Sequence, residues 1–199
     1  MLFAMATLSP PLQVVAGIQD RPTTIRTYVI VPNQSELTFQ IRHGIRQFVG
    51  RFTDFSGEIN LDHSSVEQSS INFRVRAASV DTDHAERDEH LRSEDFFHVS
   101  RFPKIVFRST RIRSHAETFE VTGDLMLRGV TKSTIVTVRT PELGSPSRLL
   151  RFSVHGSVNR RDHGMIWNRF IDRGGVLLGD QVILAMSLTT RLRESPSAQ

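Results

Sequence analysis

The sequence of 199 residues contains no cysteine, one tryptophan, one tyrosine and only two lysines. Without cysteine the chain can form no disulfide, no thiolate metal site and no cysteine nucleophile. No stretch approaches the ~20 apolar residues of a membrane-spanning helix, so we expect no integral membrane span. The sequence also lacks the G-x-S-x-G elbow, the phosphate-binding loop and the dinucleotide fingerprint, each of which would indicate a familiar enzyme class.

The basic residues are almost all of one type: 23 of the 25 are arginine, and the net charge is +4. Nucleic-acid binding requires basic residues that cluster on one face or one helix. Here they are scattered, from Arg74 and Arg76 to Arg160 and Arg161 far along the chain. This distribution favours a solvated protein exterior, so we expect no nucleic-acid partner.

Residues 1–26 are interpreted as an N-terminal arm. The arm resembles a weak signal peptide, because it has a short apolar stretch and a Val14-Val15-Ala16 sequence that resembles a cleavage site. It has no lysine or arginine near its start, and Pro10-Pro11 interrupts the apolar run. We therefore expect a cytoplasmic rather than a periplasmic location.

From about Tyr28 onward, apolar residues alternate with polar ones, which is the pattern of half-buried β-strands. Together with an opening strand near Tyr28 to Val31, about eight or nine strands are expected. The clearest one-sided apolar sets are Leu37, Phe39 and Ile41; Phe55, Gly57, Ile59 and Leu61; Ile71, Phe73, Val75 and Ala77; Ile105 and Phe107; Phe119, Val121, Gly123, Leu125 and Leu127; Ile135, Val136 and Val138; Leu150, Phe152, Val154, Gly156 and Val158; and Val182, Leu184, Met186 and Leu188.

Strands with one apolar face must hide that face, either in a sandwich or in a closed barrel. The pattern alone leaves both open, and it also leaves open whether the interior is filled or holds one small ligand. Only the segment from about Asp83 to Ser93 indicates a helix, with a candidate cap at Thr82 or Asp83. We assign residues 27–194 to one mainly β domain and residues 195–199 to a C-terminal tail.

The segment RDEHLRSEDFFHVSRFP, residues 87–103, combines reactive and apolar side chains. A metal site is one reading, but His84 and Asp88 would share a helix face whereas His90 would point elsewhere. The spacing of a zinc-protease helix is absent as well. Paired carboxylates could perform acid–base catalysis only in a substrate cleft, which a sequence does not reveal. We therefore expect neither metal ligands nor catalytic residues here, and interpret the polar side chains as local supports of the helix.

The apolar half of the same segment needs a burial partner. Leu91, Phe96 and Phe97 could complete a dry core, or they could border a ligand cavity at one end of the barrel. The pattern of the residues alone favours the dry core.

Several stretches together resemble the YceI-like family, also called the polyisoprenoid-binding protein family. The resemblance covers about Tyr28 to Leu192, and its most specific part is ASVDTDHAERDEHLRSEDFFHVSRFPKIVFRST. The other stretches are YVIVPNQSELTFQIRHG, VGRFTDFSGEINLD, VTGDLMLRGVTKS and VNRRDHGMIW.

The resemblance implies a lipocalin-like, extended antiparallel β-barrel of about eight strands with one short helix and an apolar cavity. It implies a long-chain isoprenoid lipid, a quinone tail or a fatty amide as ligand, carried or stored without a cofactor and without catalysis. An enzyme acting on isoprenoid or quinone-like substrates through His90, Asp88 or His163 is the alternative, and the sequence leaves open whether the chain is a monomer or a homodimer. The side chains expected to contact the ligand are Phe39, Phe73, Phe97, Phe107, Leu125, Leu127, Phe152, Val154 and Trp167.

Three positions depart from the family pattern. Gln34 stands where the family often has histidine, and Met126 replaces a usual threonine. His163 replaces a phenylalanine, which places an imidazole where an apolar wall is expected. We interpret His163 either as a sign of a different ligand head group or as a histidine that faces solvent.

Overall fold

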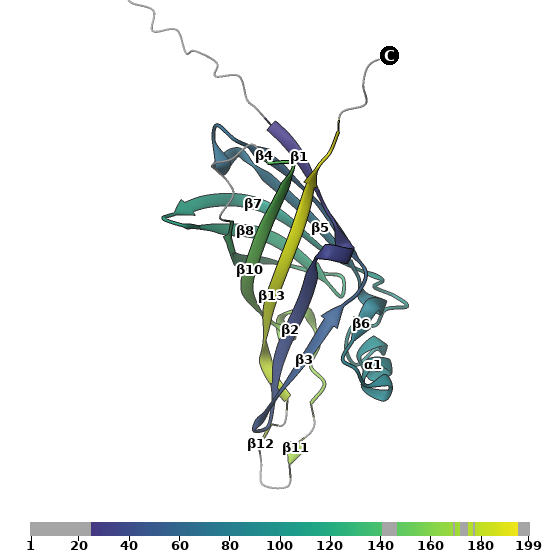
Figure 1. Ribbon diagram of the computed structural model, residues 1–199. Coiled ribbons are helices and arrows are strands. Elements are labelled where there is room, and N and C mark those ends of the chain that lie inside the picture. The colour runs from purple at the N-terminus through teal and green to yellow at the C-terminus, as the bar shows by residue number, and fades with distance from the viewer. Residues whose placement is uncertain (1–24, 141–146, 169, 172–174, 177, 195–199) are drawn as a thin grey trace, which may run out of the picture.

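The computed structural model describes residues 25–140, 147–168, 170–171, 175–176 and 178–194 (Figure 1). Most of the expected N-terminal arm and the whole C-terminal tail lie outside these residues. No helix within the described residues is long and apolar enough to cross a membrane. The strands are β1 (Ile25–Ile30), β2 (Glu36–His43), β3 (Arg46–Phe52), β4 (Phe55–Asp62), β5 (Ser70–Arg76), β6 (Val80–Asp81), β7 (Lys104–His115), β8 (Thr118–Leu127), β9 (Val130–Arg139), β10 (Leu149–Asn159), β11 (Phe170–Ile171), β12 (Gly175–Val176) and β13 (Leu178–Leu192).

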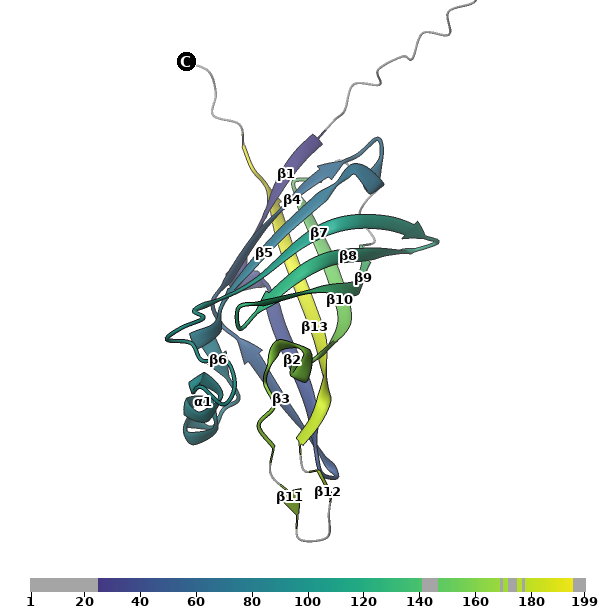
Figure 2. The ribbon, with the colours of Figure 1, turned by 180° about the vertical axis from the view of Figure 1, so that it is seen from behind.

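Eight of these strands close into an antiparallel barrel in the order β1-β4-β5-β7-β8-β9-β10-β13, and β13 pairs back with β1. Figure 2 shows β7, β8 and β9 side by side on one wall. The expected mainly β, lipocalin-like barrel of about eight strands with one short helix is therefore confirmed. The helix is α1 (Ala85–Arg92), and short 3-10 turns are η1 (Pro32–Gln34), η2 (Val66–Gln68), η3 (Ala77–Ser79) and η4 (Arg160–His163).

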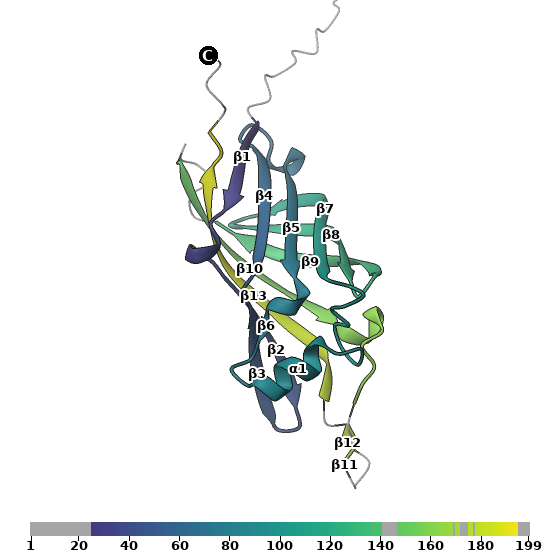
Figure 3. The same cartoon turned by 90° about the vertical axis from the view of Figure 1, so that its right-hand side faces the viewer.

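The last strand has two neighbours on the same side. Near its C-terminal end β13 pairs with β1, where Thr190 lies opposite Ile30. Over its longer N-terminal part it pairs with β2 instead, where Leu184 lies opposite Phe39. Strands β2, β3 and β6 therefore extend the wall below the end of β1, and α1 follows β6 beside this extension (Figure 3).

Strand β3 is absent from the expected set, because its inward face carries a glycine between Phe48 and Phe52. A Cβ atom added to Gly50 would lie 2.4 Å from the ring of Phe39 on the paired strand. Gly123 gives the same room to the ring of Phe107. These glycines let two large rings lie against the barrel wall.

The helix begins two residues later than the sequence suggests. Its N-cap is His84, whose Nδ1 accepts a hydrogen bond from the Arg87 amide at 3.4 Å. Thr82 and Asp83, the expected caps, serve other contacts, and Asp83 has a φ of 59°. Threonine and aspartate are preferred N-cap residues. Here Thr82 instead contacts Asp88, and Asp83 contacts Arg51 on β3.

Candidate ligand-binding cavity

The inward faces of the barrel strands enclose one elongated cavity of about 400 Å³. A volume of this size lies within the ~300–1,000 Å³ typical of small-molecule pockets. Its lining extends from Val66 and Phe119 near one barrel end to His90 and Trp167 near the other, and it is almost entirely aliphatic and aromatic. The alternation of apolar residues along the strands produces this lining, since alternate side chains point to one face.

All nine residues expected to contact a ligand line this cavity. They come from β2, β5, β7, β8 and β10, from the loop after α1 and from the loop after η4. They are Phe39, Phe73, Phe97, Phe107, Leu125, Leu127, Phe152, Val154 and Trp167. Their common location is an observation, whereas contact with a ligand stays a prediction.

One end of the cavity meets the protein surface. We call this end the mouth, and define it by Phe48, Val49, His90 and Trp167, which all line the cavity. Val49 is 52% exposed and the His90 side chain is 39% exposed, so both contact solvent as well as the cavity. Leu91, Phe96 and Phe97 border the cavity at this end, which overturns the dry-core reading of their segment.

Aromatic rings cluster at the mouth. The ring of His90 lies edge-on to Trp167, with centroids 4.8 Å apart, and edge-on to Phe96 at 5.0 Å. The His90 Nε2 atom lies 2.9 Å from the carboxylate of Asp95, which fixes the orientation of the ring. His90 is therefore held as one wall of an aromatic group that borders the cavity.

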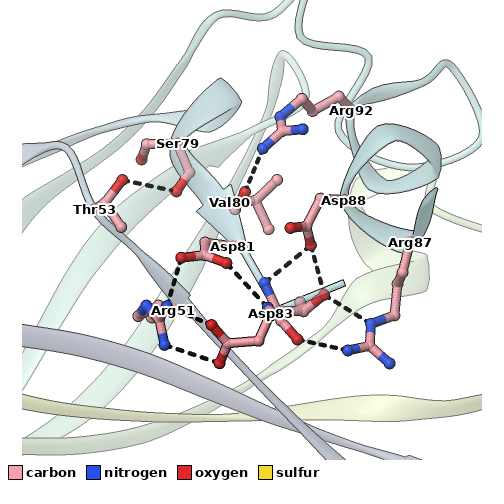
Figure 4. A network of polar contacts seen from close by, with 10 residues as sticks. Arg51, Thr53, Ser79, Val80, Asp81, Asp83, Arg87, Asp88 and Arg92 are labelled. Atoms are coloured by element: carbon pink, nitrogen blue, oxygen red, sulfur yellow. Dashed lines mark hydrogen bonds and ion pairs between the residues drawn. The ribbon is translucent and has the colours of Figure 1, made fainter. Parts of the chain in front are cut away.

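The polar residues of α1 attach the helix to the preceding turn (Figure 4). The Asp88 Oδ1 atom accepts hydrogen bonds from the Thr82 amide at 2.9 Å and from the Thr82 hydroxyl at 2.5 Å. The Arg87 guanidinium donates to the hydroxyl and carbonyl oxygens of the same threonine. Arg92 donates to the carbonyls of Ala78 and Val80. These contacts are the local supports of the helix that the sequence predicts, and those of Asp88 and Arg87 meet at Thr82.

A second group joins this turn to β3. Arg51 donates to the carboxylate of Asp81 at 2.7 Å and to that of Asp83 at 2.6 Å (Figure 4). The hydrogen bond from the Asp83 amide lowers the pKa of Asp81, and the Arg51 side chain lowers it further. Asp81 therefore stays ionised, and its charge is used in holding the turn.

We expect Asp88→Ala to destabilise the protein by about 1 to 3 kcal/mol, because it leaves the buried Thr82 amide without its acceptor. Thermal unfolding followed by circular dichroism should show this loss. The matched control is Glu89→Ala, an exposed position on the same helix, which should unfold like the wild type. Equal melting temperatures for the two variants would contradict the role assigned to Asp88.

Arg160 is a structural residue that the sequence misassigns to the exterior. It is only 2% exposed, and its guanidinium donates to the carbonyls of Met165, Trp167, Leu178 and Gly179. It also lies 3.2 Å from the carboxylate of Asp180, which is 40% exposed. Burial lowers the pKa of Arg160, and an arginine side chain stays protonated in proteins. Arg160 thereby fixes the loop that carries Trp167 to the start of β13.

The three departures from the family pattern do not create a polar head-group site in the cavity. His163 is 1% exposed, lies outside the cavity lining and has its Nδ1 atom 3.1 Å from the carbonyl oxygen of Val130. Both readings of His163, as a head-group ligand and as a solvent-facing residue, are therefore wrong. Gln34 is exposed and Met126 lies outside the lining as well.

Within the described residues, no group of three or more histidine, aspartate and glutamate side chains is arranged to hold a metal ion. Of the three residues considered for catalysis, only His90 lines the cavity. Asp88 is buried against Thr82, and His163 is enclosed beside Val130. The arrangement therefore offers an apolar compartment with two imidazoles at its mouth, that of His90 and that of His43, whose ring lies edge-on to Phe48 with centroids 5.0 Å apart.

Residues 28–190 match the family model described as the YceI-like domain. The chain belongs to the YceI-like family. Curated relatives of this YceI-like chain include UPF0312 protein plu2095 of Photorhabdus laumondii, 41% identical over 108 residues. UPF0312 protein PA0423 of Pseudomonas aeruginosa is 39% identical over 109 residues. These alignments cover 53% and 54% of the chain, and they span about half of either relative, 56% of its length.

Solved structures show the same fold. BcnA from Burkholderia cenocepacia superposes with a TM-score of 0.72 at 19% identity, covering 80% of the YceI-like chain and 98% of BcnA. The YCEI protein of Campylobacter jejuni gives 0.61 at 24% identity, covering 73% and 85%. A polyisoprenoid binding domain from Saccharophagus degradans, implicated in plant cell wall breakdown, gives 0.59 at 14% identity, covering 83% and 98%.

Proposed function

We propose that this protein binds a long-chain apolar lipid in its barrel and acts as a carrier or store rather than as an enzyme. The observation that carries the proposal is the continuous apolar lining, which extends from Phe119 at one end to Trp167 at the mouth. An elongated ligand without polar groups along its length fits such a lining. A polyisoprenoid, a quinone tail and a fatty amide all have this character.

The driving force is the transfer of the chain out of water. Each buried methylene is worth about 0.8 kcal/mol, so a ligand of several isoprene units gains a large transfer term. Immobilising the flexible chain offsets much of this gain. Selection should therefore depend on the length of the tail more than on the chemistry of its head. The description of the Saccharophagus degradans neighbour as polyisoprenoid-binding accords with this ligand class.

The alternative function is an enzyme that acts on isoprenoid or quinone-like substrates. One observation favours it: His90 lines the cavity and is oriented by Asp95 at 2.9 Å, as a general base would be. The contact between His90 and Asp95 is equally explained by a structural role, in which it holds the His90 ring at the mouth. A His90→Ala variant distinguishes the two functions, because only an enzyme has a turnover to lose.

The test is mass spectrometry of organic extracts from protein purified without an affinity tag. A long-chain lipid at close to one per chain, retained by His90→Ala, supports the carrier. An extract without lipid from folded protein contradicts it. Turnover of an added prenyl or quinone substrate that His90→Ala abolishes establishes the enzyme instead, and elemental analysis of the same sample detects any stoichiometric metal.

We expect the emission of Trp167, the only tryptophan, to shift to shorter wavelength when a long prenyl lipid is added to lipid-stripped protein. The ligand would replace water beside a half-buried indole at the mouth. A water-soluble analogue of the lipid head without the tail is the control and should leave the emission unchanged. A spectrum that stays constant at saturating prenyl lipid would contradict the placement of Trp167 on the ligand path.

A further inference from the structure

The tip of the β2–β3 hairpin exposes a large apolar side chain that the turn does not need. Gly44 and Ile45 form a two-residue turn, and Gly44 supplies the positive φ, 60°, that such turns favour at their first position. The second position accepts polar residues equally well. Ile45 is nevertheless fully exposed and lies outside the cavity lining. Its side chain contributes neither to the turn nor to the core.

A second exposed isoleucine lies at the same end of the molecule. Ile166 is 67% exposed, and with Ile45 it is one of the two most exposed large apolar side chains of the described residues. Its neighbour Asn168 is hydrogen-bonded to Leu178, and Leu178 lies opposite His43 at the end of β2. Figure 1 shows the hairpin projecting at the end opposite the C-terminus. The two isoleucines therefore flank the mouth, which lies between the hairpin and the Trp167 loop.

The hairpin is also basic. Between Glu36 and Asp54 the sequence contains Arg42, Arg46 and Arg51 and no carboxylate. Arg51 is paired with acidic residues of the β6 turn, whereas Arg42 and Arg46 are exposed and form no ion pair with any described residue. Two free cationic side chains thus stand on either side of Ile45 at the tip.

We propose that the hairpin tip of residues 42–47, together with Ile166, docks the mouth onto the surface of a bilayer that contains anionic phospholipid. Apolar side chains that enter the headgroup boundary, beside arginines that attract anionic lipids, are the two components of interfacial binding. Docking there would place the cavity mouth against the bilayer in which a long-chain lipid resides. The suggestion that docking delivers or collects a lipid rests on the proposed lipid-binding function. The docking surface itself does not, because it is inferred from exposed isoleucines and from arginines that form no ion pair with a described residue.

The experiment is sedimentation of the purified full-length chain with vesicles of 70% phosphatidylcholine and 30% phosphatidylglycerol, without any prenyl lipid. We expect binding to these vesicles, weak binding to pure phosphatidylcholine vesicles, and loss of binding as salt screens the arginines. Arg42→Gln with Arg46→Gln should lower the partition coefficient about 25-fold, since a basic residue at an anionic surface is worth about fivefold. Ile45→Ser should lower it about tenfold through lost apolar burial.

Matched controls lie elsewhere on the barrel. Arg111→Gln with Arg113→Gln removes the same charge from exposed positions of β7, and Ile135→Ser removes an isoleucine that is 55% exposed on β9. Both controls should sediment like the wild type. Equal losses in controls and hairpin variants, or no binding of the wild type to anionic vesicles, would overturn the proposal. A dimer that Ile45→Ser converts to monomer, without vesicle binding, would assign the surface to a second copy of the chain and overturn it too.

Extraction of lipid from the same preparations separates this inference from the function on which it rests. Chains that carry lipid but ignore vesicles would refute the docking surface and leave the carrier intact. Chains that bind anionic vesicles but never carry lipid would refute the carrier and leave the docking surface intact.

Discussion

Replacing Phe107 by aspartate should deplete the cavity of lipid by at least about tenfold. The ring of Phe107 lines the cavity and lies against Gly123, where a Cβ would come within 2.4 Å of it. A carboxylate there would face only apolar neighbours or draw in water, and desolvating one ion costs several kcal/mol. Because each 1.4 kcal/mol is a tenfold change in affinity, a long apolar chain should no longer compete with that water. Mass spectrometry of lipid extracted from the folded variant is the measurement.

The control for this prediction lies on the same strand. Val106→Asp introduces the same charge one residue earlier, on a side chain outside the cavity lining. It should retain the lipid of the wild type, and circular dichroism should show both variants folded. Phe73→Asp, on the strand paired with β7, should reproduce the Phe107 result, since Phe73 lies directly opposite Phe107. A folded Phe107→Asp protein with full lipid content would refute the placement of the ligand.

Arg160→Met should produce the largest loss of stability, about 3 kcal/mol or more. The substitution keeps an apolar stem but leaves the carbonyls of Met165, Trp167, Leu178 and Gly179 without their donors. Each buried acceptor left unpaired costs about 1 to 3 kcal/mol, partly relieved by water. For a domain of this size the melting temperature should fall by about 6 to 12 °C. Thermal and urea unfolding followed by circular dichroism measure the effect.

The neighbouring residue provides the control. Arg161→Met removes a guanidinium that is 52% exposed and lies 3.7 Å from Asp180, and such surface pairs contribute little. Its melting temperature should stay within about 2 °C of the wild type. Arg160→Met should also alter the Trp167 emission, because its donor to the Trp167 carbonyl is lost. A variant that melts with the wild type would show that water replaces the guanidinium without cost.

The barrel could be predicted because a side-chain period of two records which face of a strand is buried. Residues Phe119 to Leu127 show this clearly, since their inward set lines the cavity and is separated by outward residues such as Asp124. The period does not distinguish a filled barrel from a hollow one. Only the resemblance to the YceI-like family favoured a cavity, and the glycines that accommodate the rings gave no such signal by themselves.

The supports of the site could not be predicted from the pattern. Arginine is rarely buried, so Arg160 was assigned to the exterior, and the carbonyls that enclose it lie up to 19 residues away along the chain. His163 was misread for the same reason, because its partner Val130 is 33 residues distant. The family stretch VNRRDHGMIW was the one available signal, since it contains both residues. Strand β3 was missed because Gly50 interrupts its apolar face.

The wall of the cavity consists of parts that are attached in different ways: backbone ladders join the strands of the closed barrel, whereas side chains join residues 83–102 to it. Each strand of the closed barrel is hydrogen-bonded to a neighbour on both sides. A single strand cannot leave the barrel without breaking both sets of backbone hydrogen bonds, so we expect these strands to open only when the whole domain unfolds. The backbone hydrogen bonds of residues 83–102 stay within that segment, among the described residues, and side chains such as Arg92 and Asp88 attach it to the wall. Because side-chain contacts, including those of Leu91 and Phe97 with the core, join residues 83–102 to the barrel, we expect this segment to detach at a lower free energy than the barrel opens. We expect the proposed ligand to enter beside the mouth in this way, while all backbone ladders of the closed barrel stay paired.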